Sequence, residues 1–195
     1  MTIAQSYIIY TEPASEPVTL DEAKLHLKMD GISADDTLIT ALIIAARQLA
    51  EEYCGIKFIN TVIEEVYDRF PMGTNEIMYL SCGRVTAVDS VKYYDSNDDL
   101  QTFNSANYIV DTYRKQARIG LASSASFPTY DSDRINGVMV RYTSGFGASA
   151  SSVPEIIKSA IKLTIGHLYL NREDTVKKMP TMVEYILNPY RIDLV

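Results

Sequence analysis

Hydrophobic residues recur with the period of a helix near both ends of this chain, and with the shorter period of a strand between them. The clearest helical segment covers residues 152–173, where apolar and small residues repeat along one face. That face consists of Ile157, Ala160, Ile161, Thr164 and Leu168. Ser152 and Glu155 have the spacing of a capping box, and Pro154 falls where a backbone N–H is not needed. We therefore expect this helix to open at Ser152.

A short helix is predicted in the first thirty residues. Thr19 and Glu22 form a second capping-box pattern, in which each residue satisfies a backbone N–H of the other. Asp30-Gly31 follows the periodic stretch and is expected to end the helix.

A longer helix is predicted over 36–54, capped by Asp35 or Asp36 and terminated by Gly55. Apolar residues occupy most of its sides, which is typical of a helix that is buried on most sides. In a chain of this size, we expect one side to contact a neighbouring helix and the other to contact another subunit.

Between residues 58 and 147 the pattern is that of short strands separated by turns. The strand-like segments are 61–68, 76–80, 85–94, 108–113, 119–121 and 137–142. Because no helical pattern intervenes, they favour an antiparallel β-sandwich or small barrel. A further strand is expected over Tyr7–Tyr10, near the N-terminus. At the other end, 181–187 fits two helical turns and 188–195 is expected to be extended.

The chain is therefore predicted to be an α+β protein made of a helical bundle with an inserted antiparallel β domain. Residues 1–57 supply the N-terminal strand, a loop and the first helices of the bundle. Residues 58–147 supply the β domain, and 148–195 supply the last bundle helix and a tail.

Composition narrows the class of protein. The 195 residues are 47% hydrophobic and 22% charged, as in ordinary globular proteins, and no apolar run is long enough to span a membrane. The start of the chain lacks the features of a secretory signal, and two isolated cysteines fit a reducing intracellular setting.

The net charge of −7 is unevenly distributed. Residues 1–149 hold 12 basic and 20 acidic side chains, whereas residues 150–195 hold 6 and 5. This balance excludes tight nucleic-acid binding, which needs Lys and Arg to displace counterions. An acidic surface is still compatible with DNA that slides past without sticking.

Catalytic and ligand-binding motifs are weak. The run 145–150 fits G-x-G-x-x-A but lacks a surrounding βαβ unit, so a strand-to-helix turn is the better interpretation. The run 95–99 resembles a calcium loop but lacks its glycine and closing glutamate, so a polar hairpin turn is favoured. His26 and His167 belong to no zinc-ligand or nucleophile motif. We predict no catalytic residue, no metal ion and no cofactor.

Several segments, taken in order, resemble the phage head–tail connector family. They are the run 16–27, Asp35-Asp36 with the Ala-rich helix that follows and ends in Glu51–Gly55, the stretch 142–147, the two helix segments 153–158 and 167–173, and Pro189-Tyr190-Arg191. Together they span nearly the whole chain, while the central β region carries no recognisable motif. The resemblance implies a structural protein of the virion neck, without enzymatic activity, that is present in the host cytoplasm during assembly.

By that resemblance, the subunits form a ring, commonly of twelve, beneath the portal protein, and DNA passes through it without sequence-specific binding. The ring joins the head to the tail or to a stopper or tail-completion protein, and no membrane is involved. A closing ring needs two complementary faces on each subunit. We assign one to the long helix, at Leu38, Leu42, Ala45 and Leu49.

The C-terminal tail, after residue 173, is the second surface for which the resemblance suggests a partner. A tail this apolar is expected to dock on a partner, with the portal as the first candidate. Its predicted contact residues are Met182, Tyr185, Ile186, Leu187, Pro189, Tyr190, Arg191, Ile192 and Leu194. Packing of the tail on the chain's own helices is the alternative. A small β-rich ligand-binding module or hydrolase, and a stopper or tail-completion protein, stay open as other functions.

Overall fold

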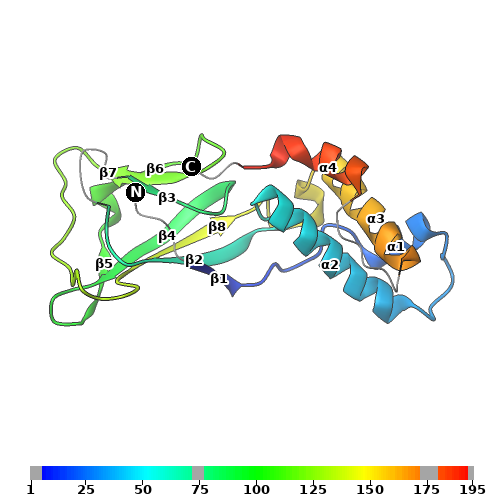
Figure 1. Ribbon diagram of the computed structural model, residues 1–195, viewed down its shortest axis with the longest axis horizontal. Helices are drawn as coiled ribbons and strands as arrows, with labels where there is room; N and C mark the ends of the chain where they lie inside the picture. Colours follow the sequence, from blue (N-terminus) through cyan, green and yellow to red (C-terminus); the bar gives the residue numbers. More distant parts are fainter. Residues whose placement is uncertain (1–5, 72–76, 172–179, 193–195) are drawn as a thin grey trace. The chain divides into compact units, whose positions relative to one another are not determined.

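A computed structural model describes residues 6–71, 77–171 and 180–192 of the chain, which form an α+β fold with antiparallel sheets (Figure 1). The chain divides into two compact units. The sheet unit comprises described residues 6–12, 61–71, 77–145 and 192; the helical unit comprises 13–60, 146–171 and 180–191. The segment 6–12 thus belongs to the sheet unit, and not with the helices that follow it in sequence. Within the described residues, none of the helices is both long enough and apolar enough to cross a membrane.

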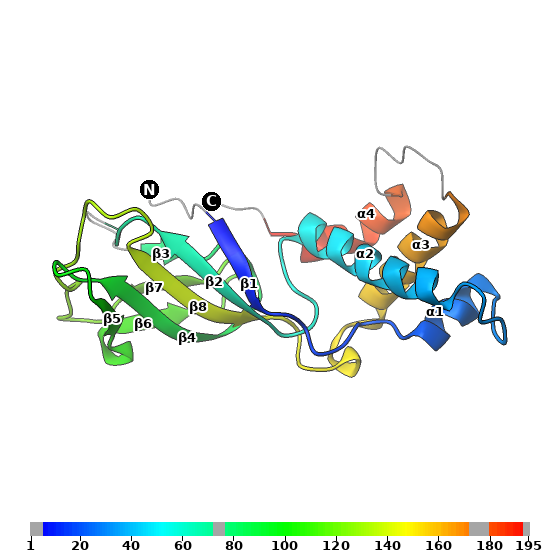
Figure 2. The ribbon, with the colours of Figure 1, turned by 90° about the horizontal axis from the view of Figure 1, so that it is seen from below.

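The strands of the sheet unit form two antiparallel sheets. The first is five-stranded, in the order β1-β2-β8-β4-β5, and the second is three-stranded, in the order β3-β7-β6 (Figure 2). The strand bounds are β1 Ser6–Thr11, β2 Thr61–Tyr67, β3 Ile77–Tyr79, β4 Val85–Tyr94, β5 Leu100–Phe103, β6 Tyr108–Asp111, β7 Arg118–Leu121 and β8 Val138–Ser144. Among the described strands, the barrel alternative is not found.

One apolar core lies in the sheet unit and draws residues from both sheets. Along β2 and β8 every second residue is buried, because successive side chains of a strand point to opposite faces. Phe70 is the centre of an aromatic group, with its ring 4.5 Å from Phe127 and 5.8 Å from Phe103. Large rings in tilted and stacked contacts bury much apolar area.

The helical unit contains α1 (Leu20–Leu27), α2 (Asp36–Cys54), α3 (Glu155–Leu170) and α4 (Thr181–Leu187). The predicted capping box at Thr19 is confirmed: Thr19 Oγ1 accepts the Glu22 N–H at 3.2 Å, and Glu22 accepts the Thr19 N–H at 2.7 Å. The helix ends at Lys28, in the left-handed conformation, before the expected Asp30-Gly31. Gly55 ends α2 with φ of 68°, as expected.

The predicted opening of the late helix at Ser152 is wrong. Residues 150–152 form a short 3₁₀ turn, and α3 begins at Glu155 with Pro154 as its N-cap. Pro154 is extended, with ψ of 137°, and its carbonyl accepts the N–H groups of Ile157 and Lys158. The proline is thus the N-cap in place of Ser152, and the helix begins at Glu155.

The tail is helical for longer than expected. Helix α4 covers the predicted 181–187, but a 3₁₀ turn over Asn188–Tyr190 follows where an extended chain was predicted. Arg191 is the first residue to return to an extended conformation.

Candidate functional site

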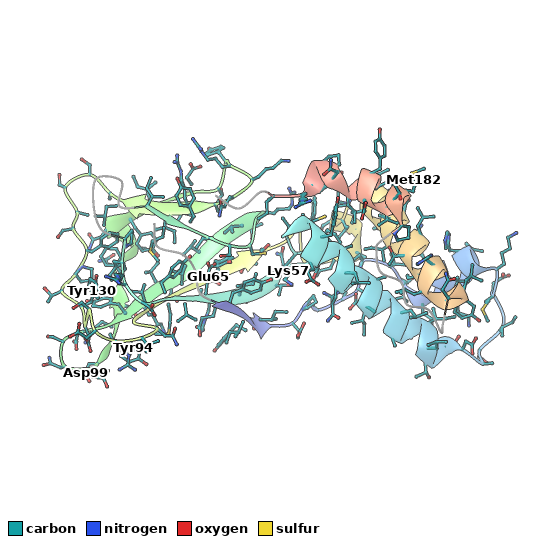
Figure 3. The ribbon with its side chains drawn as sticks, in the orientation of Figure 1. Lys57, Glu65, Tyr94, Asp99, Tyr130 and Met182 are labelled. Carbon is teal, nitrogen blue, oxygen red and sulfur yellow. The ribbon has the colours of Figure 1, made fainter. Side chains whose placement is uncertain are left out.

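A buried ion cluster holds the C-terminal half of α2. Arg47 and Glu51 are 4% and 2% exposed, and Arg47 Nη1 donates to Glu51 at 2.9 Å. Arg47 Nε donates to Glu16 at 2.7 Å. Glu51 also accepts the Phe58 N–H at 2.9 Å, and the Lys57 ammonium lies 3.4 Å from it (Figure 3). Burial acts to lower the pKa of Arg47, but the two carboxylates outweigh it and the pKa is raised. The cluster ties the segments before α1 and after α2 to one helix.

The predicted subunit contact follows α2 as a stripe beside its buried face. Leu38, Leu42 and Ala45 are half-buried, and Leu49 is 43% exposed. The apolar residues of the fully buried face are Ile39, Ile43, Ala46, Ala50 and Cys54. The stripe is therefore apolar, accessible and held on a helix that its other face anchors.

Helix α4 has one buried and one exposed side. Val183 and Leu187 are fully buried, whereas Met182 is 62% and Tyr185 is 80% exposed (Figure 3). The Leu187 carbonyl accepts the Cys54 thiol at 3.8 Å, which joins the end of α4 to the end of α2. Of the predicted tail contacts, Leu187 thus packs inside the helical unit, while Met182 and Tyr185 face outward.

The turn after α4 packs through aromatic rings. The Tyr190 ring lies 6.1 Å from Phe146, which lies 6.4 Å from Phe58. The Arg191 guanidinium lies 5.5 Å above the Tyr53 ring.

The other predicted tail contacts differ in exposure. Ile186 is half-buried, Pro189 is exposed, and Ile192 is 7% exposed. Leu194 lies outside the described residues. The tail therefore both packs on its own chain and presents an outward side.

A second buried carboxyl group lies in the sheet unit, and the partners that the described residues give it are hydroxyl and amide donors. Glu65 points into the core from β2 and is fully buried (Figure 3). It accepts the hydroxyls of Tyr67 at 2.8 Å, Tyr142 at 2.7 Å and Ser81 at 2.7 Å, and the Ser81 N–H at 3.0 Å. Burial first, and the nearby Glu65 charge second, raise the pKa values of both tyrosines. Sequence reasoning missed this network, although Glu65 lies at an inward position of an alternating strand.

The 95–99 run and His167, which the sequence offers as ligand-binding or catalytic candidates, make local hydrogen bonds in the structure. Asp95 accepts the N–H groups of Asn97 and Asp99 at 2.9 and 3.1 Å, as in the predicted hairpin turn. His167 lies in the last turn of α3, beside the Asn171 amide. Among the described residues, no group of three potential metal ligands is found.

The glycine-rich run is a tight turn between β8 and α3. A Cβ atom at Gly147 would lie 2.3 Å from Ser152 Oγ and 2.5 Å from Ser152 Cβ, which rotation of the serine side chain cannot move away, so the turn favours glycine. All the described strand pairs are antiparallel, so the run lacks the parallel βαβ unit of a dinucleotide site.

Solved structures share the fold of the whole chain. One is from the neck of an empty gene transfer agent particle computed with C6 symmetry: it is 18% identical, 98% of this chain and 97% of that chain are covered, and the TM-score is 0.81. Another, from the virion of a native gene transfer agent particle, is 20% identical with the same coverage and TM-score. A third, from the neck of a native particle computed with C12 symmetry, is 19% identical, covers 96% and 97%, and has a TM-score of 0.69.

Family membership rests on the sequence match. No curated protein matches the chain. The model of the phage gp6-like head-tail connector protein family matches residues 17–118, more than half of the chain, from just before α1 to the first residue of β7. The chain belongs to the gp6-like head–tail connector family and is a structural connector protein.

Proposed function

We propose that this chain forms a ring in the neck of a phage-like particle and joins the DNA-filled head to the tail. The observation that carries the proposal is the family match over 17–118, together with a fold shared end to end with neck proteins. The related particles were computed with C6 and C12 symmetry, which supports a cyclic ring, and twelve subunits satisfy both. The role is structural, without catalysis, and the sheet unit acts as a β-sandwich inserted into the helical bundle.

One face of the ring contact is the α2 stripe, defined by Leu38, Leu42, Ala45 and Leu49. These side chains are apolar and accessible, and burying them against a neighbour removes apolar area from water. Leu42→Glu is expected to abolish ring formation while the subunit stays folded, because position 42 is not fully buried. Leu42→Met, which keeps the apolar volume, is the control. Rings formed equally by both variants would contradict this assignment.

The outward side of α4 is the surface that we assign to the portal protein. Met182 and Tyr185 present large apolar groups from a helix whose other side is anchored by Val183 and Leu187. Exposed aromatic anchors of this kind carry much of the energy of protein interfaces.

Paired variants test the α4 assignment. A Met182→Ala/Tyr185→Ala double variant is expected to weaken portal binding at least tenfold, with unfolding free energy changed by no more than about 0.5 kcal/mol. Leu187→Ala, on the buried side, should instead cost about 2–5 kcal/mol of stability. Titration calorimetry with the portal of the same phage measures the binding. Undiminished binding by the double variant would contradict the assignment of the portal contact to α4.

The acidic balance of residues 1–149 supports passage of DNA without adhesion. Like charges between a channel wall and phosphates repel, and contacts that release counterions are scarce. We assign the channel wall to this acidic part. A filter-binding assay at low salt is expected to show no retention of duplex DNA by the ring, and salt-dependent retention would contradict the assignment.

A further inference from the structure

Strand β1 is the edge of the five-stranded sheet, and four consecutive large apolar residues on it are accessible. They are Tyr7, Ile8, Ile9 and Tyr10, which are 43%, 54%, 37% and 53% exposed. An uncharged, strand-forming run at a sheet edge favours association with another chain unless something covers it. Among the described strands of the sheet unit, β1 exposes the most large apolar side chains, and the Arg141 guanidinium lies 3.4 Å from the centre of its Tyr10 ring.

The core-side face of β1 is accessible because the second sheet does not extend over it. Tyr7 pairs with Glu65 and Ile9 with Ile63, so these two side chains share the face of β2 that enters the core. The shared core takes residues from β2 to β8, including the three-stranded sheet, but none from the described part of β1. The second layer thus ends over β2, where the Tyr67 hydroxyl reaches the β3 carbonyl of Tyr79 at 2.9 Å. Within the described residues, β1 extends beyond the second sheet as a single layer, which we call the β1 ledge.

The opposite edge of the same unit has both layers, and each of its two edge strands exposes one large apolar side chain. There β5 ends the first sheet and β6 ends the second, and the rings of Phe103 and Tyr108 stack at 5.7 Å to join them. Leu100 on β5 is 48% exposed and Ile109 on β6 is 60% exposed. Apart from Ile135 and from Tyr113, which follows β6, these edges hold all the exposed large apolar residues of the described sheet unit.

We propose that the β1 ledge of one copy packs against the β5/β6 edge of the next copy in the ring. Two different apolar edges on one unit meet the requirement of a heterologous contact that closes into a ring. A contact between two β1 strands needs a two-fold axis, which a purely cyclic ring lacks. This inference rests on the proposed ring, and it adds a second contact to that of the α2 stripe.

Cysteine pairs test the contact directly. An Ile8→Cys/Ile109→Cys variant treated with a short bismaleimide is expected to give a ladder of multimers on a denaturing gel. Each single variant should stay monomeric on the same gel. The matched control is Ile8→Cys/Ile135→Cys, because Ile135 is also exposed but does not belong to the β5/β6 edge, and it should give no ladder. The native Cys54 and Cys82 are buried, so they do not compete for the reagent.

Each outcome decides the proposal. A ladder from the first pair alone supports the β1 to β5/β6 contact. Dimers from Ile8→Cys alone overturn it in favour of paired β1 strands. Rings seen by native mass spectrometry without any cross-link overturn it and leave the proposed ring intact, whereas neither rings nor cross-links overturn both.

Discussion

Two buried glutamates in this chain are stabilised by different groups. Glu51 is held by Arg47 and Lys57, whereas the partners of Glu65 in the described part of the chain are hydroxyl and amide donors. Both arrangements give a buried carboxyl group its hydrogen-bond partners, and a buried polar group without partners would be costly. The pair at positions 47 and 51 has visible helical spacing, but its third member, Glu16, lies 31 residues earlier in the chain than Arg47.

Removing the cation from the buried pair should be far more costly than removing one from a surface pair. Arg47→Met is expected to lower the unfolding free energy by about 3–5 kcal/mol, because it leaves Glu51 under-compensated. Arg118→Met, which breaks the accessible pair with Asp111, should cost less than about 1 kcal/mol. Urea denaturation of both variants measures the difference. Equal losses of unfolding free energy in the two variants would show that burial does not determine how much each ion pair contributes to stability.

The buried thiol of Cys54 makes stability fall in alkali. Burial raises its pKa to about 12, whereas an unfolded thiol titrates near ~8.5. Above that lower value the unfolded chain loses a proton that the folded chain keeps, so the stabilisation is complete below it and declines as pH rises.

A cysteine variant isolates this effect. In Cys54→Ala the slope of unfolding free energy against pH, between about pH 9 and 11, should be less steep by up to ~1.4 kcal/mol per pH unit. Denaturant titrations at several pH values measure both slopes. Identical slopes in wild type and variant would contradict the account.

At the scale of elements, local patterns predicted most helices and strands, and the misses have physical reasons. β5 was missed because only Phe103 of its four residues is buried, so no alternation shows. β1 was predicted as a strand, but its partner β2 lies more than 50 residues away, and no local pattern reports such a pairing. The exposed sides of α2 and α4 follow from which helices pack together, which helical period alone does not determine.

The capping box at Thr19 should stabilise α1 measurably. Thr19→Ala removes the side-chain acceptor for the Glu22 N–H and is expected to cost about 1 kcal/mol. Ser149→Ala is the control, because Ser149 also precedes a helical turn, but its hydroxyl pairs with the exposed Ser151 hydroxyl and caps no backbone N–H. Thermal unfolding of the two variants gives the comparison, and equal midpoints would remove the role assigned to the cap.

At the scale of the whole molecule, the helix–sheet–helix order of the sequence becomes two units with separate surfaces. The helical unit presents the α2 stripe and the outward side of α4, and the sheet unit presents two apolar edges. A subunit with several accessible apolar surfaces on well-anchored elements fits a protein that is buried in an assembly. The family match identifies the protein as a head–tail connector.

Cryo-electron microscopy of the chain mixed with the portal protein of the same phage tests the central claim most directly. We predict a closed ring coaxial with the portal, with the α2 stripe between neighbouring subunits and the outward side of α4 against the portal. A chain that stays monomeric in the presence of the portal, or that binds it without forming a ring, would contradict the account.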